Sequence, residues 1–265
     1  KEFPERFYDV AIAEQHSVTL AAGMACEEKK PVVAIYSTFL QRAYDQLIHD
    51  VALQNLDVLF AIDRAGLVGE DGPTHSGNYD LAYLRCIPNM IIAVPADENE
   101  ARMLLTTTFN HNGPAAVRYP RGGGINAVIN LELNSVEIGK GRVINSLDSD
   151  LLVLNFGALI ATSEEVAKEL NASLLDMRFV KPLDKELIAE YSKGKKAIIT
   201  IEDGAMTGGA GSAVSEWAQE NKINVQIIIC GIPDEFVDHS SREEMIEAVR
   251  LDKKGILARV KDYLS

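Results

Sequence analysis

The sequence has few positive charges for its length, few cysteines and no long apolar run. Its 26 Lys and Arg stand against 39 Asp and Glu, so the formal net charge is −13. A chain this acidic is a poor general partner for nucleic acid or for an anionic membrane surface, and we expect it to bind neither. Any anionic ligand must then be held by arginines placed locally, against the field of the whole chain.

The three cysteines, Cys26, Cys86 and Cys230, lie far apart in apolar contexts. Their spacing fits neither a metal site nor an even-numbered disulfide framework, so we expect reduced, buried thiols and a cytoplasmic protein. The first residues lack the pattern of a signal peptide, and no apolar run reaches the length of a membrane span. Because the first residue is Lys1, we expect the chain to be part of a longer protein.

Short β-branched runs alternate with longer helical ones along the 265 residues. Nearly continuous apolar strands between helices are typical of a parallel sheet covered on both faces, so we predict an α/β fold. In the first half the predicted strands are Pro31–Tyr36, Val58–Ile62, Met90–Val94 and Ala115–Tyr119, and the predicted helices are Phe39–Gln54 and Glu98–Phe109.

Three consecutive glycines, Gly122–Gly124, indicate a boundary. We predict one domain over residues 1–123, a linker over 124–149 and a second, smaller α/β domain over 150–265. In the second half the predicted strands are Leu151–Leu154, Leu174–Asp176, Ala197–Ile201 and Val225–Ile229, and the predicted helices are Ser163–Leu170, Lys185–Tyr191, Gly211–Glu220 and Arg242–Val249.

Glu14 is the first candidate for chemistry. It lies between the apolar run Val10–Ala13 and a small-residue helix pattern, so we expect it to be buried. Isolated carboxylates are rarely buried unless something pairs with them, and such a group can exchange a proton with a bound ligand. The alternative is that Glu14 only stabilises the first turn of the helix that follows.

Further candidates follow the predicted strands, where ligands bind in open α/β sheets. Tyr36 and Phe39 could stack on a flat ring, or they could be ordinary core aromatics. Arg64 and Arg121 follow two other strands and would hold a phosphate if those strands are neighbours; otherwise they form surface salt bridges. His75 lies in a turn-rich loop and is a candidate for proton transfer, although most loop histidines have no such role.

A glycine-rich turn over residues 201–212 resembles a phosphate-binding loop. It lacks the lysine of a P-loop and the spacing of the dinucleotide fingerprint. We therefore interpret it as a close-packing or interface turn.

Six segments together resemble the 1-deoxy-D-xylulose-5-phosphate synthases, a family of transketolase-like, thiamine-diphosphate-dependent enzymes. The segments are D-V-A-I-A-E-Q-H (9–16), A-I-Y-S-T-F-L-Q-R-A-Y-D-Q (34–46), A-I-D-R-A-G (61–66), G-E-D-G-P-T-H-S-G (69–77), Y-L-R-C-I-P (83–88) and V-R-Y-P-R-G (117–122). The resemblance implies two doubly wound α/β sheets, in a pyrimidine-binding domain followed by a smaller transketolase C-terminal-type domain. It also implies that the chain acts as a homodimer.

The resemblance implies a role for each candidate residue. Glu14 would hydrogen-bond the aminopyrimidine of thiamine diphosphate and act in catalysis with His75. Phe39 would stack on the pyrimidine, with Tyr36 beside it. The substrates would be pyruvate and glyceraldehyde 3-phosphate, which condense with loss of CO₂ to a precursor of isoprenoids, thiamine and pyridoxal.

The substrate site would be lined by Tyr36, Arg42, Asp71 and His75. The phosphate of the aldehyde would be bound by Arg64 and Arg121. The family's G-D-G…N motif for Mg²⁺ and diphosphate is not present in these residues, so we expect no metal ligands here and expect this chain alone to be inactive. Two related enzymes stay open as alternatives, namely the β subunit of a 2-oxo-acid dehydrogenase and the C-terminal half of a split transketolase. A further alternative is a non-catalytic dimerisation fragment.

Overall fold

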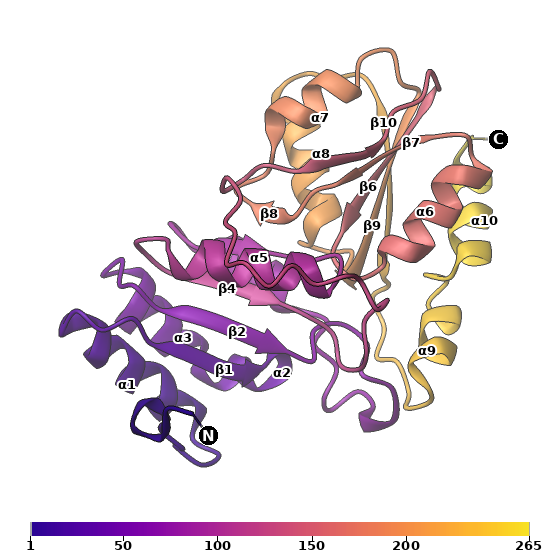
Figure 1. Cartoon of the computed structure of the whole chain (residues 1–265). Helices are drawn as coiled ribbons and strands as arrows, with labels where there is room; N and C mark the ends of the chain where they lie inside the picture. The colour runs from indigo at the N-terminus through magenta and orange to yellow at the C-terminus, as the bar shows by residue number, and fades with distance from the viewer. Residues whose placement is uncertain (1, 265) are drawn as a thin grey trace.

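In a computed structural model, which describes residues 2–264, the chain forms two five-stranded sheets (Figure 1). The strand orders are β1-β2-β4-β3-β8 and β10-β9-β6-β7-β5. The predicted α/β fold with two sheets is therefore confirmed. The strands are β1 (Val32–Tyr36), β2 (Leu59–Asp63), β3 (Ile91–Ala93), β4 (Ala115–Arg118), β5 (Arg142–Asn145), β6 (Leu151–Phe156), β7 (Ser173–Asp176), β8 (Phe179–Lys181), β9 (Ala197–Ala205) and β10 (Gln226–Ile232).

Helices cover both sheets. The α-helices are α1 (Glu14–Cys26), α2 (Ser37–Leu40), α3 (Tyr44–Gln46), α4 (Asp80–Arg85), α5 (Glu98–Phe109), α6 (Ile160–Glu169), α7 (Lys185–Tyr191), α8 (Ala210–Glu220), α9 (Arg242–Ala248) and α10 (Lys253–Leu264). Helical segments of other types are the 3₁₀ segments η1 (Pro4–Arg6), η2 (Gln41–Ala43) and η4 (Gly69–Asp71) and the π-helical segment η3 (Leu47–Ala52). Helix α5 packs on β4, β3 and β2, whereas α1 packs on β1 and η3. Helix α4 contacts both β3 and β9, so it lies where the two sheets meet.

Several helices begin at polar caps that were readable in the sequence. The Asp97 side chain accepts a hydrogen bond from the backbone N–H of Glu100 at 2.8 Å, and α5 starts at Glu98 as predicted. Asp184 does the same for α7, which spans the predicted residues, and Ser241 forms a capping box with Glu244 at the start of α9. Such caps satisfy backbone donors that have no partner within the helix.

Four features differ from the sequence prediction. Both sheets are mixed, because β8 runs antiparallel to β3 and β5 runs antiparallel to β7. Strand β8 follows β7 of the second sheet, yet it joins the first sheet. Strand β5 lies inside residues 124–149, which we expected to be a linker. The single helix expected over 39–54 is divided into α2, η2, α3 and η3, since Ala43 leaves helical geometry at φ −109° and ψ 19°.

The expected burial of the thiols is correct for only one of them. Cys230 is buried, whereas Cys26 and Cys86 are exposed. The sequence analysis also did not predict strands β5 and β8 or helices α4 and α10. Among residues 2–264, no helix combines the length and the apolar character that crossing a bilayer requires.

Candidate active site

The carboxyl ends of β1, β2 and β4 lie beside one another. These strands are parallel neighbours in which Tyr36 is in register with Asp63, and Ile62 with Arg118. The segments that leave the three strands carry most of the predicted site residues. Arg64 and Arg121 follow β2 and β4, which are neighbours, as a shared phosphate site would require. Ligands bind at this edge of open α/β sheets.

Glu14 is the first residue of α1 and is only 8% exposed, as predicted. The run before it is not buried, because Ile12 is 86% exposed. Arg42 Nη1 donates a hydrogen bond to Glu14 Oε1 at 3.2 Å, and Arg42 is the one partner of this carboxylate among residues 2–264. The partner thus lies outside α1, and the second carboxylate oxygen is left for another donor.

The predicted aromatic residues form a small stack next to this pair. The rings of Tyr36 and Phe39 lie 5.4 Å apart with 12° between their planes, and the edge of His75 meets Phe39 at 5.4 Å. The Arg42 guanidinium lies 5.3 Å from the centre of the Phe39 ring. All three rings are half-buried, so the stack borders the core and is not enclosed by it.

Arg64 is held in a strained conformation directly after β2. Its φ is +56°, in the left-handed region that costs a non-glycine residue about 1–3 kcal/mol. Asp63 secures it by accepting hydrogen bonds from the backbone N–H of Arg64 at 2.7 Å and from Nη1 at 2.6 Å. The guanidinium carbon lies 3.8 Å from the centre of the Tyr36 ring. The Asp63 carboxylate and the Tyr36 ring together fix the Arg64 side chain at the end of β2.

Asp71 connects the two predicted phosphate ligands. Its Oδ2 lies 3.1 Å from Arg121 Nη1 and 3.9 Å from Arg64 Nε. Arg121 Nη1 also donates to the backbone carbonyl of Val68 at 3.1 Å, and Arg121 lines a cavity of about 880 Å³ together with Tyr119. The salt bridges that we weighed as an alternative are therefore present, but both arginines meet one shared carboxylate.

The predicted site residues are thus connected by successive contacts that run from Glu14 to Arg121. The members are Glu14, Arg42, Phe39, His75, Tyr36, Arg64, Asp71 and Arg121. Sequence reasoning overlooked Asp63 as the residue that holds Arg64, although its place at the end of a buried strand was a usable signal.

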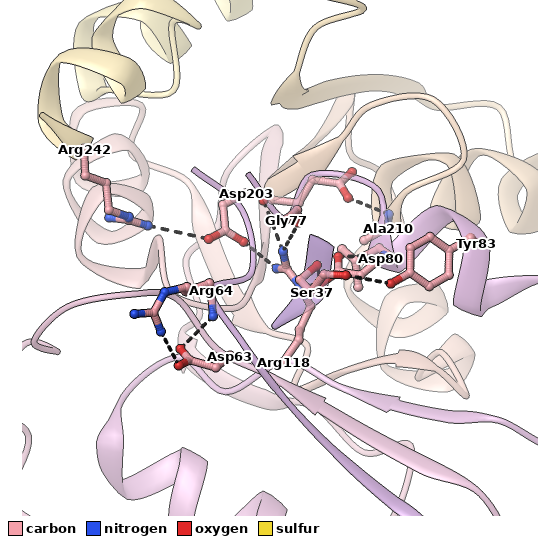
Figure 2. A network of polar contacts seen from close by, with 12 residues as sticks. Ser37, Asp63, Arg64, Gly77, Asp80, Tyr83, Arg118, Asp203, Ala210 and Arg242 are labelled. Carbon is pink, nitrogen blue, oxygen red and sulfur yellow. Dashed lines mark hydrogen bonds and ion pairs between the residues drawn. The ribbon is translucent and has the colours of Figure 1, made fainter. Parts of the chain in front are cut away.

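Sequence reasoning also overlooked a buried polar network behind the site (Figure 2). Arg118, at the end of β4, donates to Asp80 at 2.9 Å and to Asp203 of β9 at 2.5 Å. All three side chains are at most 3% exposed. Burial alone would lower the pKa of Arg118, but the two carboxylates raise it above its ordinary value. Ser37 donates to Asp80 as well, at 3.0 Å.

The glycine-rich turn after β9 is a close-packing element within this chain, as predicted. A Cβ on Gly211 would lie 2.5 Å from Ile229 and Thr200. The Glu202 carboxylate accepts hydrogen bonds from the backbone N–H groups of Ala210 and Gly211, both at 2.7 Å, and so caps α8.

Comparisons with known proteins agree with the geometry. The family model "Transketolase, pyrimidine binding domain" matches residues 1–124, and "Transketolase, C-terminal domain" matches residues 139–256. The 1-deoxy-D-xylulose-5-phosphate synthases of Cellvibrio japonicus and Pseudomonas syringae pv. syringae are 60% and 57% identical over the whole chain. The chain spans 42% of the length of each of these curated relatives.

A solved structure described as "Split gene transketolase, inactive beta4 tetramer" superimposes with a TM-score of 0.88 at 30% identity. The match covers 98% of this chain and 84% of that one. The chain therefore belongs to the transketolase family, of which it contains the pyrimidine-binding and C-terminal domains, and within that family it is similar over its whole length to the 1-deoxy-D-xylulose-5-phosphate synthases.

Proposed function

We propose that this chain is part of a synthase that condenses pyruvate with glyceraldehyde 3-phosphate, with loss of CO₂, to give 1-deoxy-D-xylulose 5-phosphate. The observation that carries the proposal is the series of contacts from Glu14 to Arg121. It places a nearly buried carboxylate, a pair of stacked rings and two arginines around one sheet edge. These are the groups needed for an aminopyrimidine, a keto acid and a phosphorylated aldehyde.

The residues present fit the pyrimidine half of thiamine diphosphate. Glu14 has a carboxylate oxygen without a partner among the described residues, and Phe39 and Tyr36 offer flat, half-exposed rings. When bound, thiamine diphosphate supplies a nucleophilic carbon and an electron sink for decarboxylation of a 2-oxo acid. Glu14 would hold a proton at the pyrimidine nitrogen, and Arg42 would orient the carboxylate through the hydrogen bond to Oε1.

The remaining part of the cofactor would be bound elsewhere in the whole protein. Residues 2–264 contain no group of His, Cys, Asp and Glu side chains placed to hold a metal ion. We propose that Mg²⁺ and the diphosphate bind to an N-terminal domain of the same protein, since the relatives are more than twice as long as this chain. The complete active site would then lie between that domain and the sheet edge described above.

The arginine pair is what favours a phosphorylated acceptor. Arg64 and Arg121 are 22% and 37% exposed in their side chains, so they are shielded enough for forked hydrogen bonds to a phosphate to matter. His75, which packs on Phe39 and lies 2.9 Å from Thr74 Oγ1, would position the substrate or transfer a proton near the reacting carbon. A 2-oxo-acid dehydrogenase transfers its acyl group to a carrier and has no use for such a phosphate site.

The test uses the full-length protein that contains this chain, supplied with thiamine diphosphate, Mg²⁺ and pyruvate. We expect CO₂ release to depend on added glyceraldehyde 3-phosphate, with one equivalent of the pentulose phosphate detected by mass spectrometry for each CO₂. Release coupled only to a lipoyl carrier or an artificial oxidant would instead identify a 2-oxo-acid dehydrogenase. No turnover under any of these conditions would favour a non-catalytic dimerisation role.

Glu14→Gln tests the catalytic carboxylate in the same assay. An amide cannot exchange the proton, and general acid–base groups contribute about 10²–10⁴-fold to rate, so kcat should fall by that factor. Glu186→Gln is the matched control, because Glu186 also lies in the first turn of a helix but is bound to Lys140 at the surface. An unchanged kcat in Glu14→Gln would show that Glu14 only stabilises the first turn of α1.

A further inference from the structure

The loop between β2 and α4 carries Asp71 and His75 and is held at its base. Gly66 and Gly77 exchange two backbone hydrogen bonds, each of 2.8 Å, which close residues 66–77 into a loop. These two bonds join the ends of the loop to each other. What fixes the base of this loop decides where Asp71 and His75 lie in the site.

The base of the loop rests on the second sheet. Gly66, at φ +72°, approaches Asp203 so closely that a Cβ there would lie 2.6 Å from the Asp203 backbone oxygen and 2.7 Å from Oδ2. At the other end of the loop, Arg118 Nη2 lies 3.5 Å from the carbonyl of Gly77 and 3.2 Å from the Asp203 carbonyl. Asp203 thus contacts the loop directly through Gly66 and indirectly through Arg118.

The tip of the loop also rests on residues of the second half of the chain. A Cβ on Gly72 would lie 2.9 Å from His239 Cβ, and one on Gly69 would lie 3.3 Å from the backbone nitrogen of Arg242. Arg242 Nη2 in turn lies 3.5 Å from Asp203 Oδ2. The carboxylate of Asp203 therefore stands between two arginines, one that fixes the loop base and one that begins the helix under the loop tip (Figure 2).

We propose that Asp203 is a positioning residue for the substrate site, and that the second domain serves the reaction by bracing the loop 66–77 through it. Asp203 itself is 2% exposed and lies behind the loop, so it touches no substrate. Its carboxylate pairs with Arg242 and, together with Asp80, with Arg118. Its backbone oxygen lies so close to position 66 that only glycine fits there. The proposal rests on the proposed function for its kinetic consequences, but the bracing itself can be observed without turnover.

The experiment replaces Asp203 by Asn in the full-length protein and measures hydrogen–deuterium exchange of residues 66–77 by mass spectrometry. The amide keeps an oxygen that can accept from Arg118 but loses the negative charge that pairs with Arg118 and Arg242, which should speed exchange in this loop by roughly ten-fold. The KM for glyceraldehyde 3-phosphate should rise by a similar factor, because Asp71 is displaced from Arg64 and Arg121. The KM for pyruvate should change by less than threefold.

Asp176→Asn is the matched control. Asp176 is also a fully buried aspartate on a strand of the second sheet, and it is also paired with an arginine, Arg142, at 2.9 Å, but it does not contact the loop. We expect it to lower thermal stability without faster exchange in residues 66–77. If both variants speed loop exchange equally, Asp203 is a general structural residue and the proposal is wrong.

A milder variant decides the question if Asp203→Asn does not fold. Arg242→Gln removes the more exposed partner of Asp203 and should still speed exchange in residues 66–77, by a smaller factor. Unchanged exchange there would overturn the bracing role. Faster exchange in a protein that proves to have no synthase activity would leave the bracing role intact and would count against the proposed function alone.

Discussion

Removal of Arg64 or Arg121 should weaken the binding of glyceraldehyde 3-phosphate and leave the binding of pyruvate nearly unchanged. Pyruvate carries no phosphate, so in the full-length enzyme Arg64→Ala and Arg121→Ala should raise the KM for glyceraldehyde 3-phosphate and leave the KM for pyruvate nearly unchanged. A hydrogen bond to a charged group contributes about 1.5–3 kcal/mol, and 1.4 kcal/mol is a tenfold change in affinity. Each loss should therefore raise this KM roughly ten- to a hundred-fold.

The structure ranks the two variants. The side chain of Arg64 is 22% exposed and that of Arg121 is 37% exposed, so a phosphate bound to Arg64 is less screened by water. Arg64→Ala also leaves the half-buried Asp63 without its partner at 2.6 Å, which adds an uncompensated negative charge near the phosphate. We expect the effect of Arg64→Ala at the upper end of the range and that of Arg121→Ala at the lower end.

Steady-state kinetics with each substrate varied in turn provide the measurement. Lysine at either position should recover only part of the loss, because it offers a point charge without the fork. Non-phosphorylated glyceraldehyde should be used about as poorly by the variants as by the parent enzyme. Lys168→Ala, which removes an exposed cation on α6 in the second half of the chain, is the control for net charge. Equal loss of affinity for both substrates would refute the phosphate site.

Three further predictions concern the chain as it stands. Residues 1–265 alone should show no synthase activity and no Mg²⁺-dependent binding of thiamine diphosphate, and tight metal-dependent binding in calorimetry would contradict this. The chain should be a homodimer by light scattering at micromolar concentration, and a monomer would count against that assignment. Burial raises the pKa of Glu202 to about 7, so the folded state keeps a proton that the unfolded state loses near the ordinary pKa of 4.5. The free energy of unfolding should therefore fall as pH rises from about 5 to 7, and Glu202→Gln should flatten that part of the urea-midpoint profile; an identical profile would refute it.

Local signals predicted the elements whose ends are marked in the sequence. Helices α5 and α7 have the predicted bounds because Asp97 and Asp184 cap them and apolar residues recur at helical spacing behind the caps. Strands β5 and β8 were not predicted, whereas the equally short β3 and β4 were, because β3 and β4 are buried, largely apolar segments that flank helix α5. Strand β5 mixes polar and apolar residues and is not fully buried, and both β5 and β8 pair with an antiparallel neighbour from another part of the chain.

The candidate site was readable for a related reason. Parallel strands bring their carboxyl ends to one edge, so the residues that follow β1, β2 and β4 meet if these strands are neighbours, a condition that the sequence left open and the strand order fulfils. The network behind them was not readable, because Arg118 and Asp203 are 85 positions apart and come from different sheets. Nothing near either residue in the sequence specifies that these sheets pack with those two side chains facing each other.

The proposed phosphate site contains an acidic residue, Asp71, beside both of its arginines. A guanidinium has five N–H donors, and Asp71 and the Val68 carbonyl engage only Nη1 of Arg121. Asp71 orients Arg121 at 3.1 Å and lies farther from Arg64, at 3.9 Å, which is held by Asp63. The Asp71 carboxylate also lowers the positive potential that a phosphate would meet, so we expect the affinity to be a balance between orientation and charge. In a chain with a net charge of −13, this local orientation would let the two arginines bind a phosphate where the overall field opposes it.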